Sequence, residues 1–518
     1  VTLQFDGTLE AANLNLREVA DFFGPHPVPE QLQGTVNLHS HLRAVPGVAG
    51  YDVLLSDLSA NLEQLRLAGQ ASLSGLLTPQ PTFAVTFAAS PIQLSQLLTT
   101  VPAEWIHPQL PVMIKDREMD GMVEVVSATI TGAVAAAGPQ LSLTGEFRVK
   151  QGQGLIGDNR VPAKDLTAVV SVEAGRVKVS NLNGLYGTIH MNESKLLVSF
   201  LEAGPWIEWD ITGTMTAADL LQHLAKTVKS EQLSRMLATM RDVEGMASTT
   251  FRMVGPLNQP GGVTFAGGEI TVQRVSLTHP SLPERLTELQ GRFVLSDGGT
   301  LFDQVTGHFG DLALQISGGI TGGSDSNFQD FLIRVTGDAD HMAKLLPPKA
   351  IPAGMIDGLV NGAVVLTGPT LSPHIRGEVV LTESKVTIPG LVEKPIGAQA
   401  TVEFEGVIPQ GSGVLLDRLE LIVPPIRLPV KGKIQLGERF SIDAAVSTGT
   451  LPLSRVPEWI AKGGFEAGNI ELSLDMKGKD LDWKSWRNTG WLALTNGLMN
   501  AKGAEGPIQD LYLRVHFV

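Results

Sequence analysis

The sequence predicts a mainly β protein: an elongated, curled antiparallel sheet of tandem repeats that forms an open apolar groove, with short Leu-rich helices between the repeats. Three observations predict this class. Apolar and polar residues alternate with period two over many short runs, turn-forming residues separate those runs, and three sequence markers recur in one order along the chain. Period-two alternation is typical of a sheet with one apolar and one polar face.

The first marker is an aromatic residue followed, fourteen residues later, by a Leu-Leu pair on a short predicted helix. It occurs at Phe83 with Leu97-Leu98, at Trp206 with Leu220-Leu221 and at Phe331 with Leu345-Leu346. Each helix start has a suitable cap, namely Ser90 before Pro91, Thr216 with Asp219, and Asp338 or Asp340. The longest helical pattern, 216–241, is expected to plug or rim the sheet, although its apolar stripe also suits a membrane or a partner.

The second and third markers are strands that open with glycine. The second strand begins at Gly34, Gly121, Gly245, Gly358 and Gly468, and the third begins at Gly145, Gly268, Gly377 and Gly490. The third-strand glycines are 123, 109 and 113 residues apart, and the first copy is shorter. We therefore expect an internal fragment of a longer protein, with five repeats at 1–81 (short), 82–205, 206–329, 330–438 and 439–518 (truncated).

One face of the predicted sheet is apolar in every copy, because the second and fourth residues after each third-strand glycine point the same way. The candidate residues that line this face are Leu141, Leu143, Phe147, Val149, Ile270, Val272, Val379, Leu381, Leu492 and Leu494. The chain is 43% hydrophobic but only 5% aromatic, and its predicted helices are few. A second sheet would normally bring large aromatic side chains into the core. We therefore expect an open apolar trough.

Composition excludes several functional classes. The chain has no cysteine, which excludes disulfides, thiol nucleophiles and zinc sites built on cysteine pairs. Its net charge is −14 and no basic stripe occurs, which argues against a nucleic-acid partner.

Three patterns could carry chemistry, and each has a simpler interpretation. The string Gly-x-Gly-x-x-Gly at 152–157 matches a dinucleotide fingerprint, but a loop-like stretch follows where a helix is needed. His39 and His41 could bind a metal as a pair but have no identifiable third ligand. Glu208 and Asp210 could be an acid pair, but a solvated strand face explains them better. We predict no catalytic residue, cofactor or metal, and no enzyme.

The recurring unit resembles the AsmA-like family of Gram-negative envelope proteins, most closely of the YhdP/TamB type. The stretch 377–390, Gly-Glu-Val-Val-Leu-Thr-Glu-Ser-Lys-Val-Thr-Ile-Pro-Gly, with Pro395-Ile396 after it, is typical of that family. The resemblance covers essentially the whole chain, but its motifs are architectural and degenerate. It implies a long β-groove in the periplasm, anchored in the inner membrane by an N-terminal helix outside this chain, that carries phospholipid between inner and outer membranes.

Two classes of function therefore compete. In the first, the groove is a bridge-like conduit whose partners are phospholipid acyl chains, the two membranes and possible envelope proteins. Burying an acyl chain in the groove lowers the free energy by about 0.8 kcal/mol per CH₂ group. In the second, the array is a structural or adhesive β-repeat scaffold and its apolar face is simply core. A role in outer-membrane protein assembly is a further alternative. The sequence favours the conduit.

Overall fold

The computed structural model of the chain describes residues 4–15, 35–48, 50–62, 65–96, 110–133, 140–156, 160–227, 238–257, 259, 262–280, 284–296, 298–322, 326–343, 354–388, 392–410, 413–436, 440–460, 465–479, 485–499 and 507–517. Strands make up 79% of the structure and helices 6%, and 29 strands form one open antiparallel sheet. The predicted mainly β, open antiparallel class is therefore confirmed.

The chain divides into two compact units. Unit 1 comprises Val1–Met215 with Ser248–Gly268, and unit 2 comprises Thr216–Ala247 with Glu269–Val518. The strands as far as the end of the first segment are β1 (Phe5–Asn15), β2 (Thr35–Gly47), β3 (Gly50–Leu62), β4 (Leu65–Leu76), β5 (Thr82–Gln93), β6 (Asp120–Ala133), β7 (Gln140–Ile156), β8 (Val161–Glu173), β9 (Arg176–Tyr186), β10 (Ile189–Leu201) and β11 (Gly204–Thr216).

Besides β11, whose last residue Thr216 belongs to unit 2, β12 (Arg241–Pro256) and β13 (Thr264–Thr278) contribute residues to both units. The strands that follow in unit 2 are β14 (Leu286–Ser296), β15 (Gly299–Phe309), β16 (Leu312–Thr321), β17 (Asn327–Asp338), β18 (Ile356–Pro369), β19 (His374–Val380), β20 (Ser384–Ile388), β21 (Val392–Lys394), β22 (Thr401–Val407), β23 (Val414–Val423), β24 (Ile426–Leu436), β25 (Ser441–Ser447), β26 (Leu451–Pro452), β27 (Phe465–Gly478), β28 (Arg487–Met499) and β29 (Ile508–Phe517).

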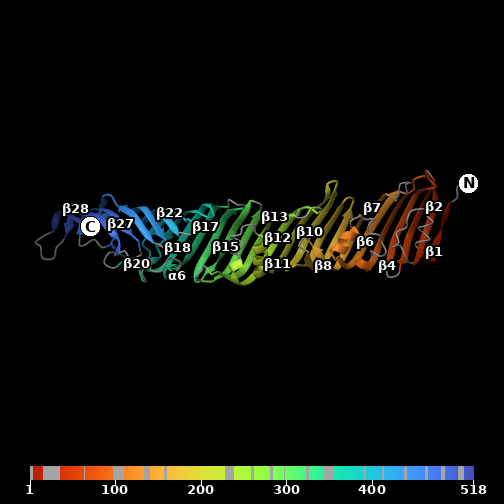
Figure 1. Ribbon diagram of the computed structural model, residues 1–518, viewed down its shortest axis with the longest axis horizontal. Helices are drawn as coiled ribbons and strands as arrows, with labels where there is room; N and C mark the ends of the chain where they lie inside the picture. The colour runs from red at the N-terminus through yellow and green to blue at the C-terminus, as the bar shows by residue number, and fades with distance from the viewer. Residues whose placement is uncertain are drawn as a thin grey trace. The chain divides into compact units, whose positions relative to one another are not determined.

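Within each unit, successive strands pair as antiparallel neighbours, so the sheet is a succession of hairpins (Figure 1). One departure occurs in unit 2. The strand β18 pairs with β19 through most of its length and with β20 at its start, and β20 pairs with β21 as a small hairpin outside the main ladder. The main ladder continues from β19 directly to β22.

The helices are short and follow strands β5, β11, β17 and β26 in the chain. They include α3 (Leu110–Asp116), α4 (Ala217–Thr227), α6 (Ala339–Ala343) and the 3₁₀ turn η2 (Leu453–Arg455), and residues 94–96 and 238–239 are helical as well. This recurrence makes the β architecture a repeated one. The boundaries of the five repeats stay a prediction.

Two of the predicted helix caps are present. The hydroxyl of Thr216 accepts a hydrogen bond from the backbone N–H of Asp219 at 3.1 Å and donates one to its carboxylate at 2.6 Å. At α6 the carboxylate of Asp338 accepts a hydrogen bond from the N–H of Asp340 at 2.9 Å. Both contacts satisfy backbone donors that a helix leaves free at its start.

One predicted helix cap was wrong, and other parts of the helix prediction lie partly or wholly outside the described residues. Ser90-Pro91 lies inside β5, which continues to Gln93, so it does not cap a helix. The predicted helix at 216–241 is described only in part: α4 covers Ala217–Thr227, residues 238–239 are helical, β12 begins at Arg241, and 228–237 lie outside the described residues. The pairs Leu97-Leu98 and Leu345-Leu346 lie outside the described residues.

The recurring third-strand glycines mark places where neighbouring strands approach closely. A Cβ atom on Gly145 would lie 2.6 Å from the carbonyl oxygen of Ser127 and 2.8 Å from the Cα of Ala128. A Cβ atom on Gly377 would meet the ring of Phe404 and lie 2.6 Å from the carbonyl oxygen of Ala363. Glycine is therefore required at these positions for want of space.

Candidate functional site: an apolar track on each unit

Unit 1 carries a continuous row of apolar side chains across all eleven of its leading strands. The strand register places these residues opposite one another in turn, one from each strand from β1 to β11, on the same face of the sheet. We call this row track 1. It consists of Ala11, Leu38, Ala60, Leu67, Ala89, Val125, Phe147, Val170, Val179, Leu196 and Trp209.

Unit 2 carries a row of the same kind across twelve main-ladder strands, from β15 to β29. We call it track 2. It consists of Val305, Ile316, Ile333, Val364, Gly377, Phe404, Leu419, Val430, Val446, Leu474, Gly490 and Phe517. The ring of Phe404 occupies the space beside the first glycine. Apolar surface therefore continues from strand to strand.

The side chains of the apolar face are buried mainly by one another. In unit 1, Val36, Ala60, Leu65, Ala89, Ile92, Val125 and Ala128 form one buried cluster that partly buried Leu38, Leu67 and Phe147 extend. The solvent-accessible surface of the chain is 30685 Å². A compact globular protein of the same 55.2 kDa would expose about 18,000 Å². Such an excess is expected of a single-layer sheet.

Two clusters flank track 2 on the same face of unit 2. The first contains Leu366, Ile375 and Leu416 on neighbouring strands. The second contains Leu381 and Val423, with Val379 packed against them. Ala339 of α6, Val386 of β20 and Trp459 belong to the second cluster. Short elements therefore cover this face at one end of the strands, beside the track.

Three of the predicted lining residues of unit 1, Leu143, Phe147 and Val149, share one face of β7. Phe147 belongs to track 1, and Leu143 and Phe147 pack against the buried cluster of that unit. Val149 is half-buried and lies between Val123 and Ala168. Leu141 occupies β7 opposite Gly132, and its side chain is outside the described residues.

The remaining predicted lining residues are placed less uniformly. Ile270 and Val272 on β13 are 3% and 9% exposed. Leu492 and Leu494 share a face of β28, but Leu492 is 37% exposed and Leu494 only 5%. Their neighbours on β29, Val515 and Leu513, are both exposed.

The strand predicted for Val379 and Leu381 requires a correction at Leu381. The predicted third strand included both, whereas β19 ends at Val380 and Leu381 follows it, held by a hydrogen bond from its N–H to the carbonyl of Ala400 at 2.8 Å. Both side chains belong to the cluster under α6 and β20. They lie beside track 2 rather than on it, since the row passes through Gly377.

Sequence reasoning missed the central members of both tracks. Val170, Val179 and Leu196 continue track 1 beyond Phe147, and Val430, Val446 and Leu474 continue track 2 beyond Leu419. Each lies in an alternating run, so alternation marks them as candidates. Only the register of the ladder selects which residue of each strand joins the row.

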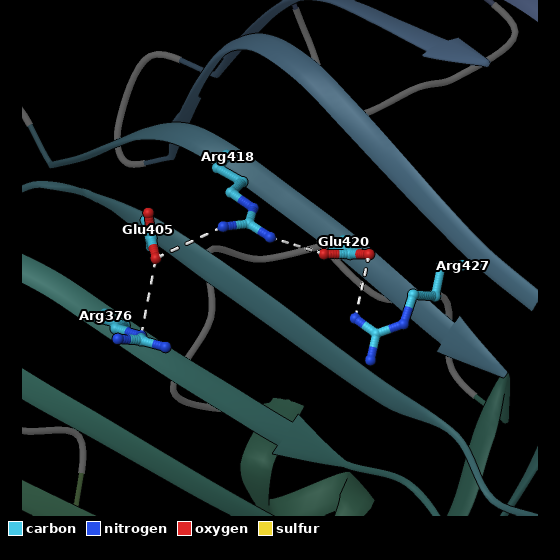
Figure 2. Close-up of polar contacts among 5 residues, drawn as sticks. All are labelled: Arg376, Glu405, Arg418, Glu420 and Arg427. Atoms are coloured by element: carbon cyan, nitrogen blue, oxygen red, sulfur yellow. Dashed lines mark hydrogen bonds and ion pairs between the residues drawn. The ribbon is translucent and has the colours of Figure 1, made fainter. Parts of the chain in front are cut away.

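The opposite face of the sheet is polar and, in unit 2, carries a network of ion pairs (Figure 2). Glu405 on β22 lies between Arg376 at 3.7 Å and Arg418 at 3.8 Å. Arg418 also binds Glu420 at 2.9 Å, and Arg427 contacts the other oxygen of that carboxylate at 3.5 Å. The hydrogen bond from Arg418 lowers the pKa of Glu420 below its usual 4.5. Glu420 is therefore ionised at neutral pH.

The patterns considered for catalysis or metal binding are occupied by other contacts. His39 and His41 each face an acidic residue of β1, with distances of 3.3 Å to Glu10 and 2.7 Å to Asp6. The buried Ser40 lies between them at a shift of register. Among the residues that the structure describes, no group of three or more potential ligands could hold a metal ion.

Glu208 and Asp210 share a cation instead of forming an acid pair. Arg252 on β12 lies 2.9 Å from Glu208 and 4.0 Å from Asp210. The glycine string at 152–157 begins within β7, and β8 starts at Val161, so no helix follows it in the described chain. Its last glycine is outside the described residues.

No described helix combines the length and the apolar character that crossing a membrane requires. No protein-family model, no curated protein and no solved structure matches the chain. The conclusion about function therefore depends on the two tracks and on the sequence pattern itself.

Proposed function

We propose that the chain is a bridge-like lipid-transfer protein in which phospholipid acyl chains lie along the apolar track of each unit while the head groups stay in water. The observation that carries this proposal is the continuity of tracks 1 and 2, in which every strand contributes an apolar residue or a glycine. Burial gains about 0.8 kcal/mol per CH₂ group. A uniform row therefore holds a chain firmly without a barrier to sliding.

The resemblance to the AsmA-like family supports the rest of the proposal. The phospholipid would move between the inner and outer membranes across the periplasm, and an anchor would lie outside this chain. The charged opposite face suits an aqueous compartment, because exposed ion pairs such as Arg376 with Glu405 stay hydrated.

Neighbouring valines on β8 provide a matched pair of variants for the test. Val170 belongs to track 1 between Phe147 and Val179, whereas Val169 lies on the opposite face between Arg148 and Ser180. Both are half-buried. Val170→Asp puts a charge across the acyl path, and Val169→Asp puts the same charge beside an arginine.

The measurement is transfer of a fluorescent phospholipid between donor and acceptor vesicles, with circular dichroism to verify folding. We expect Val170→Asp to fold and to lose most of the transfer rate, because a carboxylate in an open groove keeps its water but interrupts the apolar path. Val169→Asp should transfer at the normal rate. Normal transfer by a folded Val170→Asp would refute the path.

A structural or adhesive scaffold is the second candidate, and the buried cluster around Val36, Ala60 and Ala128 favours it, because those side chains bury one another without a ligand. In that case Val170→Asp would place an unpaired charge in a closed core and unfold the protein. Purified protein would also contain no phospholipid when extracted and examined by mass spectrometry.

A further inference from the structure

Unit 2 contains a cleft of about 460 Å³ where three segments of chain meet. Its walls come from Ala398 and Gln399, from the Pro424–Pro425 turn between β23 and β24, and from the stretch 454–459 after η2. The volume lies in the range of small-molecule sites.

The cleft adjoins the apolar face. Val423 and Trp459 line it, and both also belong to the cluster that contains Val379, Val402 and Leu421. Val423 is 6% exposed, so it is a wall of the cleft and a member of the sheet's apolar surface at once. An amphiphile with its chain on the apolar face therefore has a site for its polar end at this cleft.

Two exposed, oppositely charged side chains line the cleft. Arg455 and Glu458 are separated by only two residues of chain, and neither has an ion pair within the described residues. Three arginines on the polar face of the same unit behave differently, since Arg376, Arg418 and Arg427 all pair with glutamates. Gln399 and Ser454 add hydrogen-bonding groups.

We propose that this cleft binds the zwitterionic phosphate–ammonium head group of an amphiphile whose acyl chains lie on the apolar face of unit 2. Arg455 recognises the phosphate, because a guanidinium binds phosphate oxygens through two parallel hydrogen bonds. Glu458 binds the ammonium. The proposal rests on the proposed function, since it needs acyl chains on that face.

The test measures binding to the full chain by titration calorimetry with four soluble probes. They are dihexanoylphosphatidylethanolamine, the phosphatidylglycerol with the same chains, octyl maltoside, and phosphoethanolamine without chains. The variants are Arg455→Gln and Glu458→Gln, and the control is Arg376→Gln, which removes the same charge from the polar face, where Arg376 is 81% exposed.

We expect Arg455→Gln to lower the affinity for both phospholipids about tenfold, as for loss of a charge-assisted hydrogen bond. The affinity for octyl maltoside should not change. Glu458→Gln should lower the affinity for the ethanolamine lipid alone. Arg376→Gln should leave the affinity for every probe unchanged.

Three results would overturn the head-group site while leaving the proposed function intact. The first is that Arg455→Gln and the wild type bind phospholipid with equal affinity. The second is that Arg455→Gln and Arg376→Gln lose the same amount of affinity. The third is that phosphoethanolamine binds as tightly as the lipid, which indicates a free-phosphate site. Failure of octyl maltoside and both lipids to bind the wild type would instead contradict the proposed function.

Discussion

Lys394 shows how a single side chain holds the small hairpin that covers one end of the apolar face in unit 2. It is 1% exposed, and its ammonium donates to the carbonyl oxygens of Ser384, Pro395 and Thr382 at 2.6, 3.0 and 3.3 Å. Burial lowers the pKa of this amine from 10.5. Its contacts tie β21 to the chain before and within β20.

We expect Lys394→Met to destabilise the protein by about 1–3 kcal/mol, because the buried carbonyl oxygens lose their donor. Urea unfolding at neutral pH measures the change. The control is Lys385→Met, which removes an exposed lysine from the neighbouring strand β20. Equal midpoints for the two variants would mean that the buried ammonium does not hold the hairpin.

Glu420 illustrates how the opposite face is stabilised by charge. Its side chain is only 9% exposed and forms ion pairs with Arg418 and Arg427. Its cross-strand neighbour Glu403 lies between two glutamates, Glu420 on β23 and Glu378 on β19. Because its folded-state pKa is lowered, the stabilisation from Glu420 is present above the unfolded pKa and is lost as pH falls through the folded value.

Glu420→Gln should therefore lower the denaturation midpoint at neutral pH, and the difference from wild type should shrink in acid. Glu403→Gln is the comparison, because it removes a carboxylate that lies between two others and should cost less. A Glu420→Gln defect that stays constant from neutral pH into acid would contradict the role of the ionised carboxylate.

At the scale of the element, close approach between strands explains the recurring glycines. Gly377 leaves no room for a Cβ atom beside Phe404, whereas a Cβ on Gly319 would have its nearest neighbour at 3.5 Å. We expect Gly377→Ala to lower the thermal midpoint and Gly319→Ala to leave it nearly unchanged. Similar melting of both variants would mean that strand spacing adapts to the extra methyl group.

The elements were predictable to different degrees, for physical reasons. Alternation predicts the strands well, because each strand has one apolar and one polar face. Thr216 with Asp219 predicts a true cap, whereas Ser90-Pro91 carries the same signal inside β5. There β5 pairs with β6 on both sides, at Ala89 and Ile92, and the hydroxyl of Ser90 accepts a hydrogen bond from the N–H of Arg66, so tertiary contacts override a local preference.

At the scale of the whole molecule, the open antiparallel sheet follows from the sequence but the path of the tracks does not. Phe147, a predicted lining residue, pairs with Val125 and packs against the buried cluster of unit 1. Leu381 was placed on a strand that ends one residue earlier. Shifts of register, such as that between Val125 and Ser127, change which residue continues a row, and no local pattern predicts them.

The central claim is that acyl chains lie along tracks 1 and 2. The most direct measurement is photo-crosslinking of the full chain with a phospholipid that carries a diazirine at the end of one acyl chain, followed by mass-spectrometric mapping of the adducts. The account predicts adducts on the apolar face, at or beside Val170, Val179 and Leu196 in unit 1 and Val430, Val446 and Leu474 in unit 2. Adducts spread equally over both faces, or none at all, would contradict it.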